Sequence, residues 1–131
     1  MADTYPLICV VIVNFNGGEL LSEAIQSVTE STYQELKIII VDNASHDGSI
    51  EAAAAKYKDL IFIKNEKNLG FAKGNNLGVK HALSLRCKFI LFLNNDASVR
   101  SDAIELLYQH LAKHEKCGAV APFIFYHHNQ N

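Results

Sequence analysis

The sequence predicts an α/β domain with a mostly parallel, doubly wound sheet and helices on both of its faces. Two observations predict this fold. Apolar runs of strand length alternate with segments whose apolar residues recur at helical spacing. Three of the runs are almost continuously apolar, which is typical of strands covered on both faces. The strict alternation implies right-handed crossovers between parallel strands. We therefore expect one domain over residues 1–131.

Five apolar runs are expected to form the strands. Leu7–Val13, Lys37–Val41 and Lys88–Leu93 are nearly continuous in Val, Ile, Leu and Phe. Leu60–Lys64 lies between the second and third of the expected helices, and Ala119–Phe125 is a fifth run near the end. Each run is rich in the β-branched or large apolar residues from which strands are built.

Four segments between these runs have the apolar spacing of helices. They cover residues 20–28, 49–57, 71–85 and 101–111. In the first, apolar side chains between Leu20 and Val28 form one stripe. The second is rich in alanine, and either Asp47 or Ser45 is placed to cap its start.

The composition excludes several classes of protein. Hydrophobic residues make up 49% of the chain, so a packed domain is expected rather than disorder. The net charge of −2 gives no basic surface for nucleic acid. The strongest apolar run, Leu7–Val13, is much shorter than the roughly 20 residues of a membrane-spanning helix. Residues 1–6 lack the basic region of a signal peptide. The odd, widely spaced Cys9, Cys87 and Cys117 indicate free thiols, and we expect a cytoplasmic protein.

In doubly wound sheets, ligands bind beyond the carboxyl ends of the strands. The first strand leads into the segment 14–18, whose two glycines allow close approach of an anion to backbone N–H groups. An ordinary Asn-Gly turn explains this segment equally well. The second strand leads to Asp42, whose carboxylate suits a ribose hydroxyl or a base N–H. The alternative is that Asp42 orders the turn before the next helix.

The other two strand ends also carry unusual residues. Residues 65–78 contain several glycines and asparagines at a helix start, where they lower helix propensity. Gly74 and Gly78 share one helical face and permit close approach of either a strand or a ligand. Asp96 follows the fourth strand and suits Mg²⁺ or Mn²⁺, which accept few protein ligands when phosphate oxygens are present. The alternative is a helix-entry turn, with Asp96 or Ser98 bonding local N–H groups.

Together, these blocks resemble the inverting family 2 glycosyltransferases of the GT-A fold, which have a Rossmann-like nucleotide-binding half. The matching blocks are residues 10–18, 41–49, 65–78 and 93–96. They are spread over almost the whole chain, and the ordered set is more specific than any one block. Other nucleotide-binding classes fit less well. Asn14 and Asn16 stand where a phosphoacceptor domain has acidic residues, and no glycine-rich basic loop of a nucleotidyltransferase follows the first strand.

The resemblance implies roles for particular residues. On one side of the nucleotide it implies contacts to the base and ribose from Val13, Asn14, Phe15 and Asp42. On the other side it implies contacts from Asn68, Gly70, Gly74 and Asn75. Asn94 and Asn95 would bond the ribose or the sugar, and Asp96 would bind Mg²⁺ or Mn²⁺ between the two donor phosphates. A cation there neutralises the leaving diphosphate.

The chain departs from the family pattern in its Asp-x-Asp element. Asn94 replaces the first carboxylate of that element, so one negative charge is missing. This pattern most resembles the branch that includes bacterial rhamnosyltransferases. It implies a dTDP-deoxysugar such as dTDP-rhamnose as donor, and a glycan or lipid-linked acceptor in the synthesis of a cell-surface polysaccharide or glycoconjugate.

A second departure concerns the general base that deprotonates the acceptor hydroxyl. In the family this carboxylate lies well downstream of the metal aspartate, but only 35 residues follow Asp96 here. We therefore expect the base beyond residue 131 and the chain to be the donor-binding part of a longer enzyme. A non-catalytic nucleotide-binding module is the alternative. Peripheral association with the inner face of the cell membrane and a homodimer are further expectations.

Overall fold

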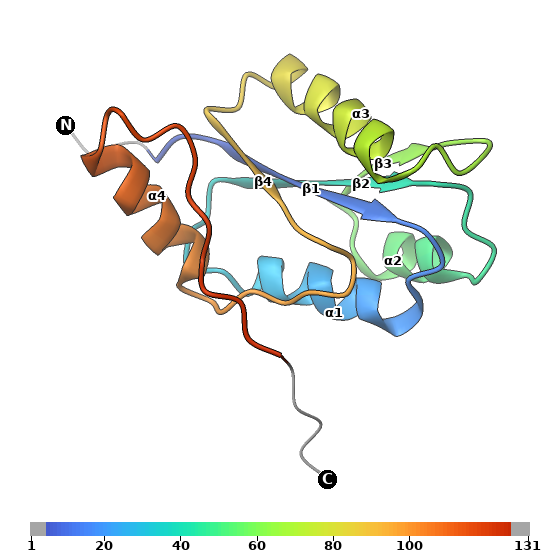
Figure 1. The fold of residues 1–131 in the computed structure, drawn as a ribbon. Coiled ribbons are helices and arrows are strands. Elements are labelled where there is room, and N and C mark those ends of the chain that lie inside the picture. The colour runs from blue at the N-terminus through green and yellow to red at the C-terminus, as the bar shows by residue number, and fades with distance from the viewer. Residues whose placement is uncertain (1–4, 127–131) are drawn as a thin grey trace, which may run out of the picture.

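The computed structural model describes residues 5–126. Of the segment 1–6 considered above, residues 1–4 lie outside the described residues. The strands in this range are β1 (Ile8–Asn14), β2 (Leu36–Asp42), β3 (Ile61–Lys64) and β4 (Phe89–Phe92). The helices are α1 (Gly18–Thr29), α2 (Ser49–Lys56), α3 (Phe71–Ser84) and α4 (Ala103–Lys113). Strands and helices alternate along the chain, as Figure 1 shows. Within the described range, no helix is both long and apolar enough to span a membrane.

The strands form one parallel sheet in the order β3-β2-β1-β4. The chain winds outward from β1 to β3 and then returns to the other side of β1, so the strand order reverses between β1 and β4. β1 and β2 pair over their full lengths, which places Asn14 opposite Asp42. The parallel, doubly wound sheet predicted from the sequence is confirmed. All four strands end at the same edge, which we call the carboxyl edge.

Helices cover both faces of the sheet (Figure 1). α3 packs on the face that carries Cys9, Val11, Ile39 and Val41, all of which are buried. α1, α2 and α4 contribute buried side chains to the larger core on the opposite face, together with Ile40. The near-continuous apolar sequence of β1 and β2 follows from this arrangement, because both faces of these strands are covered.

Gly74 and Gly78 allow α3 to lie close against β1. A Cβ atom at Gly74 would be 2.8 Å from Cγ1 of Val13, and one at Gly78 would overlap Val11 more severely. Of the two partners allowed by the sequence, a strand or a ligand, the strand is the one that approaches these glycines. Whether Gly74 also contacts a nucleotide stays a prediction.

The prediction of a fifth strand near the end of the chain is wrong. Ala119–Phe125 has no regular structure and follows α4 as an irregular segment, drawn in orange-red to red in Figure 1. Phe123 and Ile124 are 92% and 90% exposed. Strand preference is expressed only when a segment pairs with a sheet and buries one face. Within the described range this segment pairs with no strand, so its apolar sequence does not produce one.

Candidate functional site

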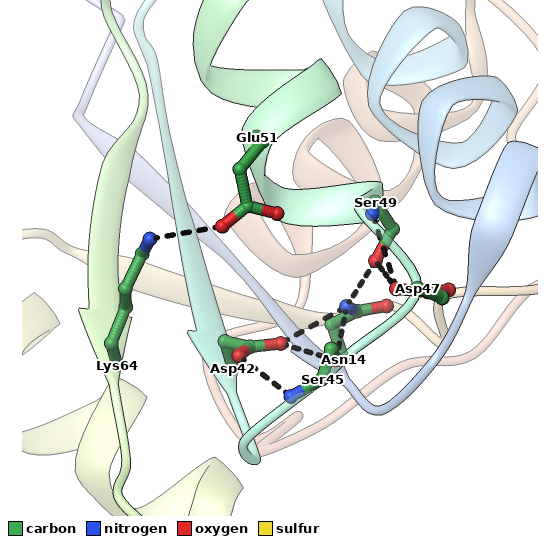
Figure 2. A network of polar contacts seen from close by, with 7 residues as sticks. All are labelled: Asn14, Asp42, Ser45, Asp47, Ser49, Glu51 and Lys64. Carbon is green, nitrogen blue, oxygen red and sulfur yellow. Dashed lines mark hydrogen bonds and ion pairs between the residues drawn. The ribbon is translucent and has the colours of Figure 1, made fainter.

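The ends of β1 and β2 are joined by a buried polar network (Figure 2). The side-chain Nδ2 of Asn14 lies 3.1 Å from Oδ1 of Asp42, 3.0 Å from Oγ of Ser45 and 3.1 Å from Oγ of Ser49. Asn14 is completely buried and Asp42 is 5% exposed. Buried polar groups are costly unless they are paired, so this network stabilises the junction between two strands and the loop that follows β2.

Asp42 itself orders the loop after β2. Its Oδ1 accepts a hydrogen bond from the Ser45 hydroxyl at 2.6 Å, and its Oδ2 accepts one from the Ser45 N–H at 3.0 Å. Its main-chain carbonyl accepts the N–H of Asn65 at 2.9 Å. The turn-ordering alternative therefore describes most of what Asp42 does. A contact from its carboxylate to a nucleoside stays a prediction.

The loop after β1 is connected to the loop after β2 through Asn16. The N–H of Asn16 donates to Oγ of Ser45 at 2.9 Å, and its Oδ1 accepts the N–H of His46 at 2.9 Å. Asn16 has a φ of 50°, a left-handed conformation that asparagine tolerates better than most residues. This cross-connection was not predicted from the sequence, although the asparagine in a turn position could have indicated it.

Asp47 satisfies N–H groups at the starts of α1 and α2. Its Oδ2 accepts the N–H of Gly18 at 2.8 Å, and its Oδ1 accepts the hydroxyl and N–H of Ser49 at 2.6 and 3.1 Å. The hydrogen bond from the Ser49 hydroxyl is the largest cause that holds the pKa of Asp47 below its ordinary value. Of the two candidates for capping α2, Asp47 is the one that serves, acting from the residue before Gly48. Ser45 bonds Asn14 and Asp42 instead.

Asn43 is a site residue that the sequence reasoning missed. It is 2% exposed, and its Oδ1 accepts the side-chain amide of Asn65 at 2.9 Å. Its Nδ2 donates to the carbonyl of Gly70 at 3.3 Å, while its own N–H donates to the carbonyl of Asn14 at 2.8 Å. Asn43 thus connects three strand ends to the loop that opens α3. An amide directly after Asp42 was the available signal.

The predicted residues around α3 lie at the carboxyl edge with different exposures. Asn68 is exposed, and its Oδ1 accepts the N–H of Gly70, which has a φ of 82°. Asn75 is half-buried and donates to the carbonyl of Phe71 at 3.2 Å within the helix. Gly74 is buried. Asn68 and Gly70 are therefore accessible to a ligand, whereas Gly74 faces the sheet.

The end of β4 is joined to this network by one side-chain hydrogen bond. Nδ2 of Asn95 donates to Oδ1 of Asn14 at 3.0 Å. Asn94 and Asp96 are exposed, and within residues 5–126 the carboxylate of Asp96 accepts no hydrogen bond. Because Asn14 also contacts Asp42, the two predicted ligand carboxylates lie at one edge of the sheet, at opposite ends of a short chain of amide contacts.

The remaining predicted positions flank this chain of contacts. Phe15 is 48% exposed, while Val13 is half-buried and packs on α3 at Gly74. A pocket also exists at the opposite edge of the sheet, lined in part by Tyr33, Leu36 and Asp59. None of the predicted ligand residues lines it, so it has no part in the site.

Comparison with known proteins identifies the family. Residues 9–131 match the family model described as Glycosyl transferase family 2. The chain belongs to glycosyltransferase family 2. A cholesterol galactosyltransferase of Borreliella burgdorferi is 31% identical over 103 residues, covering 77% of this family 2 chain and 28% of the relative. Glycosyltransferase GlyG of Streptococcus pneumoniae is 32% identical over 106 residues, covering 79% of this chain and 34% of the relative. The family 2 chain thus spans a minor part of the length of these relatives.

Solved structures confirm the GT-A fold of this family 2 domain. A crystal structure of residues 1–349 of S. aureus TarS in complex with UDP-GlcNAc has a TM-score of 0.75 and 20% identity, and the matched part is 89% of this chain and 37% of that TarS fragment. The mannosyltransferase PcManGT of Pyrobaculum calidifontis, in complex with GDP-Man and Mn²⁺, has a TM-score of 0.73 and 23% identity. The matched part is 84% of this chain and 33% of the PcManGT chain.

The side chains of this family 2 domain fit one kind of cation site, in which phosphate oxygens and waters supply most of the ligands. Within the described residues, no group of three or more His, Cys, Asp or Glu side chains could hold a metal ion. Mg²⁺ and chemically similar ions often bind one or two carboxylates and complete their coordination with phosphate oxygens and waters. The exposed carboxylate of Asp96, next in sequence to the amides of Asn94 and Asn95, fits a site of this kind, with a single protein carboxylate.

Proposed function

We propose that this family 2 domain binds the donor of a glycosyltransferase that uses a nucleoside diphosphate sugar. The observation that carries the proposal is the continuous connection from Asp42 through Asn14 to Asn95, directly before Asp96. It brings the ends of β1, β2 and β4 together where the strand order reverses, which is where doubly wound sheets bind nucleotides. Family membership favours this function over the non-catalytic module.

The proposed roles follow the placement of the residues. The half-exposed ring of Phe15 and the main chain around Val13 and Asn14 contact the base and ribose. The carboxylate of Asp42 contacts the nucleoside through the oxygen lone pairs that are not used by Ser45 and Asn14. On the other side of the nucleotide, the proposed contacts are Asn68, Gly70, Gly74 and Asn75.

The diphosphate is proposed to lie beside Asp96, with Asn94 and Asn95 directed at the ribose or sugar. A divalent cation at Asp96, Mg²⁺ or Mn²⁺, supplies charge neutralisation for the leaving diphosphate when it is bound. The complexes of TarS with UDP-GlcNAc and of PcManGT with GDP-Man and Mn²⁺ support a nucleotide sugar and a cation here. The missing carboxylate at Asn94 predicts weaker cation binding than two carboxylates give.

The finer features of the proposal rest on the sequence. The proposed mechanism is inverting, the general base lies beyond residue 131, and dTDP-rhamnose is the donor. The acceptor is a glycan or a lipid-linked glycan of a cell-surface polysaccharide or glycoconjugate. The proposed location is the cytoplasm, at the inner face of the cell membrane.

Calorimetry on the 131-residue chain tests donor binding directly. We expect dTDP, UDP or GDP to bind in the presence of Mn²⁺, and the affinity to fall at least about tenfold in Asp96→Ala or when EDTA removes the cation. Asp59→Ala is the matched control, since Asp59 is also an exposed aspartate but lies at the opposite edge. A folded chain that binds none of the three nucleotides with Mn²⁺ or Mg²⁺ contradicts the proposed function.

A further inference from the structure

The side chain of Asn14 occupies the centre of the carboxyl edge without reaching its surface. It is fully buried, and its four side-chain contacts go to Asp42, Ser45, Ser49 and Asn95. Its main-chain carbonyl also accepts the N–H of Asn43. The side chain therefore cannot contact a donor molecule, and any effect that it has on binding acts through its neighbours.

The direction of each amide in this chain is determined by Asp42. A carboxylate only accepts hydrogen bonds, so the NH₂ group of Asn14 must face Asp42. The carbonyl oxygen of Asn14 then faces Asn95, and it accepts the NH₂ group of that residue. The amide oxygen of Asn95 is consequently turned away from Asn14, and it remains an acceptor directly before Asp96 in the chain.

Asparagine at position 14 is the residue type that this arrangement needs. It donates in one direction and accepts in the other, which neither leucine nor aspartate does. Gly17 leaves the space for the contact, because a Cβ atom there would overlap Oδ1 of Asn14 and lie 2.7 Å from Nδ2 of Asn95.

We propose that Asn14 is a positioning residue that couples the nucleoside side of the site to the cation side. The carboxylate of Asp42 orients Asn14, and Asn14 orients Asn95 so that its amide oxygen serves the diphosphate, the cation or the sugar beside Asp96. This inference rests on the proposed function. It assigns to Asn14 a role distinct from direct substrate contact.

The test separates the cation-dependent part of binding from binding as a whole. The affinity for dTDP or UDP, whichever binds more tightly, is measured by calorimetry with Mn²⁺ and with EDTA, and the ratio is the Mn²⁺ enhancement. Asn14→Leu keeps the approximate size of the side chain but removes both hydrogen-bonding functions. We expect it to reduce the enhancement about tenfold, as loss of a group that orients a metal ligand does, with a smaller change in EDTA.

Two further variants sharpen the result. The double variant Asn14→Asp with Asp42→Asn exchanges carboxylate and amide but still lets residue 14 accept from Asn95, so it is expected to retain the enhancement. Gly17→Ala disturbs the contact between Asn14 and Asn95 without changing either amide, and it gives the same readout if Asn14→Leu fails to fold. Asn76→Leu, at an exposed amide on α3, is the matched control with an unchanged enhancement.

The outcomes distinguish this inference from the function on which it rests. If the unchanged chain binds no nucleotide with Mn²⁺, the proposed function fails and the inference fails with it. If the unchanged chain shows an enhancement and folded Asn14→Leu or Gly17→Ala keeps it, the coupling role is wrong while the function stands. Equal loss of affinity with Mn²⁺ and with EDTA also overturns the inference, because it indicates general damage to the site.

Discussion

The ends of β2 and β4 lie at the same edge of the sheet but are built differently. At the end of β2, Asp42 and Asn43 are almost fully buried and hydrogen-bonded to three neighbouring segments. At the end of β4, Asn94 and Asp96 are exposed, and one side-chain bond from Asn95 connects them to the rest. The central strand ends are therefore rigid parts of the fold, whereas the end of β4 presents its polar groups to solvent.

This difference shows how one edge can combine stability with access. β2 has neighbours on both sides, so its end can be surrounded by the loops after β1 and β3. β4 is an edge strand of the described sheet, with β1 as its neighbour there. Substitutions at the β2 end should consequently change folding stability, and substitutions at the β4 end should change binding alone. The following predictions test that division.

The largest stability effect is expected for Asp42→Ala. The substitution removes one of the three acceptors of the Asn14 amide and the acceptor of both donors of Ser45. Buried groups left without a partner cost about 1–3 kcal/mol each, and part of this cost is recovered by relaxation, so a loss of about 2–3 kcal/mol in the free energy of unfolding is expected. Urea denaturation followed by circular dichroism measures it. A loss below about 0.5 kcal/mol, the range of ordinary surface changes, would contradict the rigid description of this region.

A smaller loss is expected for Asn43→Ala. This change leaves the amide of Asn65 and the carbonyl of Gly70 without their partner, but both are more exposed than Asp42. We expect about 1–2 kcal/mol less stability and faster amide exchange in residues 65–72. Asn68→Ala is the control, because the single hydrogen bond that the exposed Asn68 accepts from the N–H of Gly70 should contribute less. Equal effects of the two substitutions would remove the distinction between buried and exposed amides.

The sequence predicted the sheet because its signals are local. The apolar runs of β1 and β2 and the spacing along α1 are read within a few residues, and they fix element type and alternation. The placement of the polar strand ends at one edge of the sheet followed from the parallel topology. Partners such as Asn14 and Asn95 are 81 positions apart, and no local pattern indicates which polar residue will be buried. For the same reason, the local strand preference of Ala119–Phe125 gave a wrong prediction, since strand formation needs a distant partner.

The role of Asp42 shows a second limit of sequence reasoning. An aspartate at the end of an apolar strand is compatible with ligand binding and with turn ordering. Only the positions of Ser45 and Asn14 show that the turn uses most of its oxygen lone pairs. For Asp96 the sequence was more informative, because an exposed carboxylate needs no distant partner to remain accessible.

A modest, pH-dependent loss is expected for Asp47→Asn. The pKa of Asp47 is lowered in the folded chain, chiefly by the Ser49 hydroxyl, so the unfolded chain binds the proton more readily. The stabilisation is therefore present above about pH 4 and lost as the pH falls through the folded pKa. We expect roughly 0.5 kcal/mol less stability at pH 7, as for other charges at helix starts. Urea midpoints of both chains should converge on acidification. A difference that grows at low pH would reverse the sign assigned here.

The smallest stability effect is expected for Asp96→Asn, although its effect on binding should be large. Asp96 is exposed and accepts no hydrogen bond within residues 5–126, so its charge contributes little to folding. The free energy of unfolding, measured by urea denaturation, should therefore change by less than about 0.3 kcal/mol. Asparagine keeps the shape of the side chain but removes the only carboxylate of residues 94–96, and a hard cation binds a neutral amide more weakly than a carboxylate. Mn²⁺-dependent nucleotide binding should therefore fall at least about tenfold while binding in EDTA stays the same. Measured beside Asp42→Ala, this variant gives the sharpest contrast between the two ends: one substitution weakens the fold, and the other weakens only the cation-dependent step. An Asp96→Asn chain that is markedly less stable would mean that the end of β4 belongs to the rigid part of the domain after all.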